Sequence, residues 1–270
     1  PAFIWHSAFC CSTLLLRAID AEGINLSLRE PTAFGSLAEA KRSRHPVAAG
    51  AQWWLRMMAT VLRLYDRPFA DRESVTIKPT NFCNNLIGDA MGAMSVSRSL
   101  FLYSDLRSFL ISIVKKRETG RAFARRLFST LAADSTFAAD IPPRALFHMT
   151  DLQIAAAAWL MQMAAFREAL ARFPEARARS LDAAVFLADP KRTLAAVDGH
   201  LNLGLGTAHI ESVVDGPLFA RDAKDERSEF DAARRRSEAS DVEAAFGASL
   251  DQIVAWAAKT WPKLLPLEPL

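Results

Sequence analysis

The sequence predicts an α/β fold, a three-layer domain with a mainly parallel sheet of five strands. Short segments rich in apolar residues alternate with longer segments of helical periodicity, which is typical of strand–helix–strand units. Polar residues follow several predicted strands, and parallel sheets bind their ligands at the carboxyl ends of strands. The chain of 270 residues contains no linker-like segment, so we expect a single domain over residues 1–270.

The expected elements follow from composition and periodicity. Strands are expected at residues 3–5, 24–28, 74–79, 99–105 and 180–187. The clearest helical segments are residues 12–19, 48–65, 106–116, 146–173, 190–201 and 242–261. We expect a helical insertion at residues 118–150, which are charged and then loop-like. The Pro-rich end, residues 262–270, is expected to be a flexible tail.

Charge balance and cysteine content exclude several classes of protein. The chain carries 33 basic and 30 acidic residues, a near balance that argues against a nucleic-acid binder. Its three cysteines cannot form a disulfide framework, so we expect the reducing cytoplasm. No apolar run approaches the ~20 residues that span a bilayer. The sequence lacks zinc-type Cys/His spacing, a G-x-S-x-G elbow and a G-x-G-x-x-G loop, and we expect no metal site.

The most informative segment is the loop at residues 6–11, between the first predicted strand and the first predicted helix. A helix N-terminus presents unpaired backbone N–H groups that attract phosphate or sulfate, and Ser12 and Thr13 add two hydroxyls there. On the phosphate-binding pattern G-x-x-x-x-G-K-[ST], His6 and Cys11 stand at the glycines and Ser12 at the lysine. The alternative is a buried strand that leads into an ordinary helix capped by Ser12.

The same segment resembles the 5′-phosphosulfate-binding loop of P-loop sulfotransferases, P-[KR]-S-G-T-T-[LW]. Ala8 stands at the Pro, Phe9 at the basic residue, Cys10 at the Ser, Cys11 at the Gly, and Ser12 and Thr13 at the two Thr. The resemblance implies a P-loop NTPase-like fold. It also implies transfer of a sulfuryl group from 3′-phosphoadenylyl sulfate to a hydroxyl or amine of a small molecule. The phosphosulfate would then be held by Ala8, Phe9, Cys10, Cys11, Ser12 and Thr13.

Two charged residues follow the second and third predicted strands, where catalytic groups of this family are found. Glu30 follows the second strand, and the resemblance implies that it can act as the general base. Lys78 ends the third strand and would neutralise charge on the bridging oxygen, together with Ser12. Thr80 stands where cytosolic sulfotransferases have a catalytic His, which makes Glu30 the better candidate. Alternatively, Glu30 pairs with Arg29 in solvent and Lys78 only extends its ammonium to the surface.

A second landmark resembles the 3′-phosphate motif R-[DN]-P-[RK]-D-x-x-x-S. Residues 104–112 keep the second basic residue as Arg107 and the final Ser as Ser112, whereas Ser104 replaces the first Arg. Losing that Arg removes a charge-assisted contact worth about 1.5–3 kcal/mol. The resemblance further implies a basic C-terminal loop over the nucleotide, for which Arg221 and Lys224 are the candidates.

Three functions remain open at this point. The first is a sulfotransferase whose ligands are an adenine nucleotide and a small-molecule acceptor. The second is a small-molecule kinase on the same fold, which would need ATP and magnesium. The third is a non-catalytic nucleotide-binding or partner protein that keeps the scaffold after losing family residues at Phe9, Cys11, Thr80 and Ser104.

Overall fold

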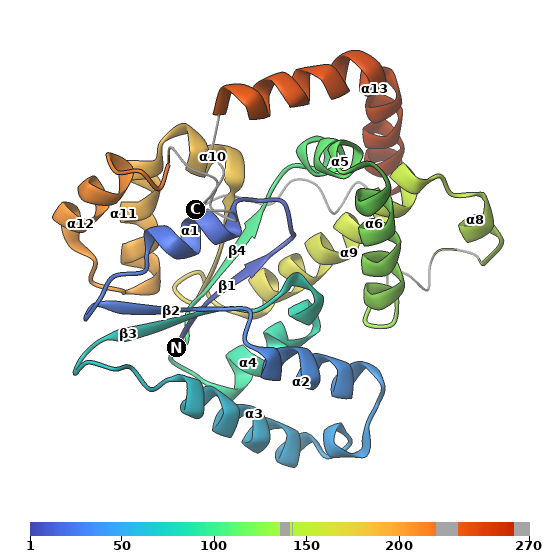
Figure 1. Ribbon diagram of the computed structural model, residues 1–270. Coiled ribbons are helices and arrows are strands. Elements are labelled where there is room, and N and C mark those ends of the chain that lie inside the picture. The colour runs from blue at the N-terminus through green and yellow to red at the C-terminus, as the bar shows by residue number, and fades with distance from the viewer. Residues whose placement is uncertain (136–140, 142, 220–231, 262–270) are drawn as a thin grey trace.

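An all-parallel, five-stranded sheet lies at the centre of the computed structural model, which describes residues 1–135, 141, 143–219 and 232–261 (Figure 1). The strand order is β2-β3-β1-β4-β5. The strands are β1 (Ala2–His6), β2 (Asn25–Arg29), β3 (Ser74–Lys78), β4 (Ser99–Tyr103) and β5 (Ala178–Asp182). The prediction of a mainly parallel sheet is confirmed.

The two central strands are apolar on both faces because helices cover the sheet from both sides. Phe3, Trp5 and Phe101 belong to one core cluster, whereas Ile4 and Leu102 belong to the other. Each strand therefore alternates between two hydrophobic cores, as side-chain direction along a strand requires. This burial explains why these strands appear in the sequence as short apolar runs.

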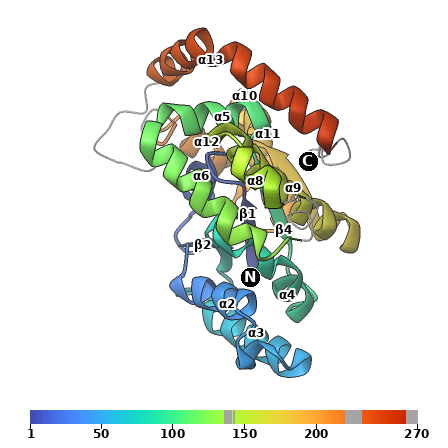
Figure 2. The ribbon, with the colours of Figure 1, turned by 90° about the vertical axis from the view of Figure 1, so that its right-hand side faces the viewer.

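Helices form a layer on each face of the sheet (Figures 1 and 2). The larger core lies beneath α2 (Thr32–Arg42), α3 (Ala51–Tyr65), α4 (Ile87–Ala93), α5 (Leu106–Lys115), α6 (Arg117–Ala132), α9 (Asp151–Arg172) and α13 (Ala232–Thr260). The smaller core lies beneath α1 (Ser12–Ala18), α10 (Ala183–Ala188), α11 (Pro190–Leu201) and α12 (Gly206–Val214). Short elements η1 (Pro46–Ala48), η2 (Asn81–Leu86) and α8 (Pro143–His148) complete the described part.

Several predicted boundaries are wrong, and the helix expected at residues 242–261 already begins at Ala232. The strand expected at residues 180–187 ends at Asp182, whose carboxylate accepts the Ala184 N–H at 2.8 Å and starts α10. The helix expected at residues 146–173 is interrupted before α9, because Thr150 and Gln153 form a capping box there. The expected insertion contains α6 and α8, and the expected tail lies outside the described residues. Among the described helices, none has the length and apolar character to cross a membrane.

Candidate functional site

The carboxyl ends of β1, β2 and β3 bring three polar side chains together. The Lys78 Nζ lies 2.6 Å from Glu30 Oε1 and 3.4 Å from His6 Nε2. Lys78 reaches both partners because β3 lies between β2 and β1 in the sheet. The Glu30 N–H also donates to the Lys78 carbonyl at 2.7 Å, which holds the two residues in register. The two residues proposed from sequence as base and charge-neutralising cation are therefore neighbours.

Burial differs sharply between the two members of this ion pair. The Lys78 side chain is only 1% exposed, whereas the Glu30 side chain is 46% exposed. A buried ammonium is stable only beside a counter-charge, and Glu30 supplies it. The alternative, in which Lys78 only extends its ammonium to the surface, is therefore wrong. The exposed part of Glu30 can meet a molecule arriving from solvent.

The loop between β1 and α1 has an unusual backbone conformation. Ala8, Phe9 and Cys11 have φ angles of 68°, 52° and 60°, in the left-handed region that non-glycine residues seldom adopt. Each such residue costs about 1–3 kcal/mol, a cost found mainly at functional sites. Left-handed residues can turn neighbouring N–H groups of a loop toward one side, a geometry that binds anions in other proteins.

The start of α1 fits the same interpretation. Its N-cap is Cys11, and no side chain caps its first turn by a hydrogen bond in the described part of the chain. The alternative of an ordinary helix capped by Ser12 is therefore wrong, because Ser12 is already the first helical residue. Ser12 and Thr13 are buried beside these uncapped amides. The loop is anchored to β4, since the Ser7 N–H donates to the Leu102 carbonyl at 3.1 Å.

The side chains of Cys10 and Phe9 point to different partners. Cys10 is fully buried in the smaller core, and desolvation raises the pKa of its thiol to about 11. The Phe9 ring packs against Phe109 and Phe123, with centroid distances of 5.7 and 5.2 Å. The Lys116 Nζ lies 5.7 Å from the Phe9 ring centroid. Lys116 thus places a cation beside Phe9, a contact that the sequence did not predict.

Asn84 joins η2 to the end of β1. Its Nδ2 donates to the His6 carbonyl at 3.3 Å, and its buried Oδ1 has no partner in the described structure. Asn84 is not a helix cap, because the N-cap of η2 is Thr80 and that of α4 is Leu86. Asn84 instead fixes the strand end that carries His6.

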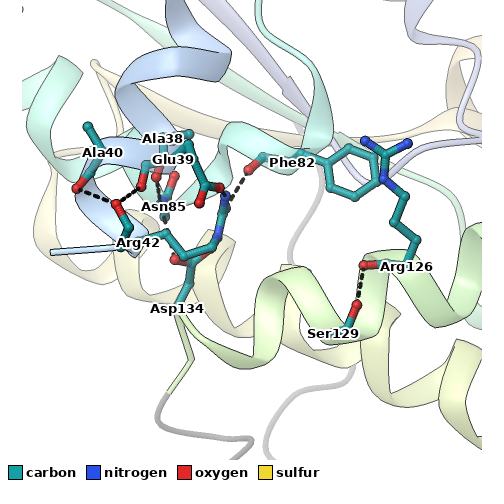
Figure 3. A network of polar contacts seen from close by, with 10 residues as sticks. Ala38, Glu39, Ala40, Arg42, Phe82, Asn85, Arg126, Ser129 and Asp134 are labelled. Atoms are coloured by element: carbon teal, nitrogen blue, oxygen red, sulfur yellow. Dashed lines mark hydrogen bonds and ion pairs between the residues drawn. The ribbon is translucent and has the colours of Figure 1, made fainter. Parts of the chain in front are cut away.

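Asn84 also lines a cavity of about 510 Å³ between η2, α2, α4, α6 and α9. Figure 3 shows the polar network at its edge: Arg42 donates to Asp134 at 2.6 Å and to the Phe82 carbonyl at 2.8 Å. Asp134 also accepts from Asn85 Nδ2 at 3.1 Å. This network ties α2 and η2 to the end of α6, so it supports the segment that carries Asn84.

The residues expected around a 3′-phosphate, Arg107 and Ser112, lie on α5 and already have other partners. Arg107 donates to Glu243 at 2.6 and 2.8 Å and also pairs with Asp251, both from α13. These hydrogen bonds lower the pKa of Glu243. Ser112 Oγ donates to the Ser108 carbonyl within α5. A phosphate at Arg107 would therefore have to share it with two carboxylates.

The other positions expected near the 3′-phosphate give no further contacts in the described residues. Ser104 Oγ is buried without a partner in the described residues. Arg221 and Lys224 lie outside the described residues. Among the residues that the structure does describe, no group of three or more His, Cys, Asp and Glu side chains is placed to hold a metal ion.

Comparison with solved structures connects this geometry to a known fold. The sulfotransferase domain from the curacin biosynthetic pathway superposes with a TM-score of 0.54 and 13% identity, over 84% of this chain and 82% of that domain. The chain has a sulfotransferase-like fold. The sulfotransferase domain of the Synechococcus PCC 7002 olefin synthase gives a TM-score of 0.48 and 11% identity, over 87% of this chain and 82% of that one. No family model and no curated protein matches the sequence significantly.

The sulfotransferase-like fold confirms the fold implied by the loop motif. At 13% identity the likeness establishes architecture and not chemistry. The site residues remain predictions, and the contacts of Lys78 with Glu30 and with His6 support them.

Proposed function

We propose that this protein is a sulfotransferase-like enzyme that moves a sulfuryl group from 3′-phosphoadenylyl sulfate to a hydroxyl or amine of a small molecule. One observation carries the proposal: the buried Lys78 ammonium pairs with the half-exposed Glu30 carboxylate at the carboxyl end of the sheet, beside a loop with three left-handed residues before the uncapped start of α1. The ligands are an adenine nucleotide and the acceptor, the proposed compartment is the cytoplasm, and no metal takes part.

In this proposal the loop holds the phosphosulfate. Backbone N–H groups of residues 8–13 and the hydroxyls of Ser12 and Thr13 bind its oxygens. Lys78, with Lys116 near Phe9, supplies the positive charge that the family draws from its loop lysine. Arg107, Ser112, Arg221 and Lys224 are the proposed 3′-phosphate contacts.

The transfer step needs positioning and electrostatic stabilisation. The acceptor oxygen or nitrogen forms a bond to sulfur while the bond from sulfur to the bridging phosphate oxygen breaks. Glu30 takes the acceptor proton from its exposed side, and the leaving group is adenosine 3′,5′-bisphosphate. The negative charge that builds up on the bridging oxygen of the leaving group lies beside Lys78.

Isothermal titration with adenosine 3′,5′-bisphosphate tests the binding half of this proposal. We expect heat of binding in the presence of EDTA, and weaker binding in Ser12→Ala because one hydroxyl is lost. ATP with magnesium is the comparison ligand, and a clear preference for it would favour the kinase alternative. No heat at millimolar bisphosphate overturns the proposal.

Transfer of label from ³⁵S-labelled nucleotide to a panel of alcohols and amines tests the chemistry. We expect Glu30→Gln to bind the bisphosphate but to transfer label at least ~100-fold more slowly, the scale of a lost general base. If the wild-type chain binds nucleotide without transferring label to any acceptor, and Glu30→Gln binds equally, the non-catalytic alternative holds.

A further inference from the structure

His6 lies between the loop and Lys78, and its two ring nitrogens face different elements. The Ala8 N–H points to His6 Nδ1 at 3.2 Å. On the other side of the ring, Lys78 Nζ lies 3.4 Å from Nε2. The ring is buried, so it exchanges these contacts for water only at a cost.

These two contacts compete for one lone pair. A neutral imidazole has one N–H and one acceptor nitrogen. The Ala8 amide and the Lys78 ammonium are both donors, so the ring accepts from one of them at a time. A protonated ring would accept from neither and would add a second positive charge beside Lys78.

Lys78 has a stronger acceptor than His6 available, and this acceptor determines the tautomer of His6 when no ligand is bound. Its ammonium lies 2.6 Å from the Glu30 carboxylate, and a charged acceptor forms the stronger hydrogen bond. The His6 lone pair at Nδ1 therefore serves the Ala8 amide. The Nε2–H then lies beside the ammonium, a contact between two donors, so the pairing of Lys78 with Glu30 is favoured over pairing with His6.

We propose that His6 is a positioning residue that links anion binding at the loop to the release of Glu30 from Lys78. The inference rests on the proposed function, since it takes a phosphosulfate oxygen as the anion. That oxygen accepts from the Ala8 N–H and from His6 Nδ1–H, two groups 3.2 Å apart. The ring exchanges its Nε2 proton for one on Nδ1 through water, and no net proton is gained or lost.

The exchanged ring then changes the partner of Lys78. Nε2 now carries the lone pair and accepts one of the three N–H groups of the ammonium. The positive charge of Lys78 is then shared between the ring and the carboxylate, which weakens the hold of Lys78 on Glu30. The Glu30 carboxylate becomes freer to accept a proton from the acceptor molecule. Binding of the sulfuryl donor thus prepares the base, and the donor binds before the acceptor becomes reactive.

The tautomer of His6 can be read directly by long-range ¹H–¹⁵N correlation spectra of the full chain labelled at histidine. The sequence contains five histidines, and His6→Asn identifies the His6 signals, with His6→Gln as a second variant for the assignment. We expect the Nε2–H tautomer without ligand and the Nδ1–H tautomer with saturating adenosine 3′,5′-bisphosphate, and the same change with inorganic sulfate.

His45 provides a matched internal control. Its Nδ1 accepts the Val47 N–H at 3.2 Å, the same contact two residues along the chain, but on the exposed segment before η1. We expect His45 to keep one tautomer at all ligand concentrations. A change at both histidines would show a general effect of the added salt and would overturn the inference.

Two further results separate this inference from the proposed function. If the amide signals of residues 8–13 respond to ligand while His6 keeps its tautomer, the inference is wrong and the proposed function stands. If neither the amides nor His6 respond and titration gives no heat, both are wrong.

A double-mutant cycle measures the proposed link as a change in affinity. Glu30→Gln removes the competitor for Lys78, so it should tighten binding of the bisphosphate. Some of that gain comes from simple charge removal and persists in the His6→Asn background. We expect the gain in the His6 background to be larger by about threefold or more. Equal gains in the two backgrounds would contradict the link.

Discussion

Lys78 carries a fully buried charge, and its stability depends on Glu30. We expect Glu30→Gln to lower the free energy of unfolding by about 1–3 kcal/mol, because the ammonium stays buried without a counter-charge. Lys78→Met should cost less, since a thioether of similar length fills the same space and leaves Glu30 in contact with water. Urea denaturation measures both values, and a larger loss in Lys78→Met would contradict this account.

The three cysteines should differ in reactivity because the thiolate is the reactive form. Burial raises the pKa of Cys10 to about 11 and that of Cys83 to about 12. Both thiols therefore stay protonated as the pH rises to 9. Cys11 is partly exposed in the loop, so we expect a thiol reagent at pH 8 to modify Cys11 first and the other two only after unfolding.

Cysteine labelling also tests occupancy of the loop. Adenosine 3′,5′-bisphosphate should slow the modification of Cys11, whereas labelling of the unfolded chain should not change. Cys11→Ser is the control and should abolish the fast phase. Fast labelling of Cys10 in the native protein would show that the loop opens far more than its packing against β4 implies.

At the scale of elements, the corner between α5 and α6 depends on a glycine. A Cβ on Gly120 would lie 2.1 Å from the Ile113 carbonyl oxygen, a backbone atom that cannot move alone. We expect Gly120→Ala to destabilise the protein by about 1–3 kcal/mol or more. Gly92→Ala in α4 is the matched control, because nothing lies within 4 Å of its Cβ position. It should stabilise by up to about 1 kcal/mol.

Thermal unfolding followed by circular dichroism compares these two glycine variants with the parent chain. A Gly120→Ala variant as stable as Gly92→Ala would mean that α5 and α6 separate without cost. The corner positions α6 beside Phe9, since Phe123 of α6 packs on that ring. Distortion of this corner by Gly120→Ala should therefore also weaken the binding of nucleotide at the loop.

Helix α13 is held on α5 by a charge cluster around Arg107. If a nucleotide 3′-phosphate binds Arg107, it competes with Glu243 and Asp251. We expect the pair Glu243→Gln and Asp251→Asn to tighten binding of adenosine 3′,5′-bisphosphate while leaving adenosine 5′-phosphate unchanged. It should also speed amide hydrogen exchange in α13. Equal effects on both nucleotides would place the 3′-phosphate elsewhere.

At the scale of the whole molecule, two hydrophobic cores share one sheet. Phe101 and Leu102 are adjacent on β4 and face opposite cores. We expect Leu102→Ala to cost about 2–5 kcal/mol and Phe101→Ala about 3–5 kcal/mol. Because the sheet belongs to both layers, each variant should shift the same transition.

Far-ultraviolet circular dichroism and tryptophan fluorescence together test this shared unfolding. The buried Trp5 and Trp159 report on the larger core. If Leu102→Ala shifted the dichroism transition and left the fluorescence transition unchanged, the two layers would unfold separately.

Much of the fold was predictable from local pattern, and the errors have physical reasons. Residues 183–187, AAVFL, are apolar and short, so periodicity cannot separate a buried strand from a helix there. These residues form the helix α10 because the Asp182 carboxylate caps its first turn. The break before α9 also has a local signal, the capping-box residues Thr150 and Gln153. The apolar pattern on both sides of them led to the prediction of one continuous helix.

The candidate site was partly predictable for a similar reason. Glu30 follows β2 and Lys78 ends β3, and parallel strands end at one edge of the sheet, so the pattern placed both residues at that edge but did not make them neighbours. The contacts of Lys116 with Phe9 and of Arg107 with Glu243 were not predictable. They join segments separated by many residues, and such contacts depend on how the helices pack.

The amino-acid sequence by itself determined the alternation of strands and helices and the polar character of the strand ends, because both depend on local periodicity and backbone chemistry. The tertiary structure alone decided that β3 lies between β1 and β2, so that Lys78 meets both His6 and Glu30. Strand order in a parallel sheet depends on where each connecting helix packs, and that packing is a property of the assembled core.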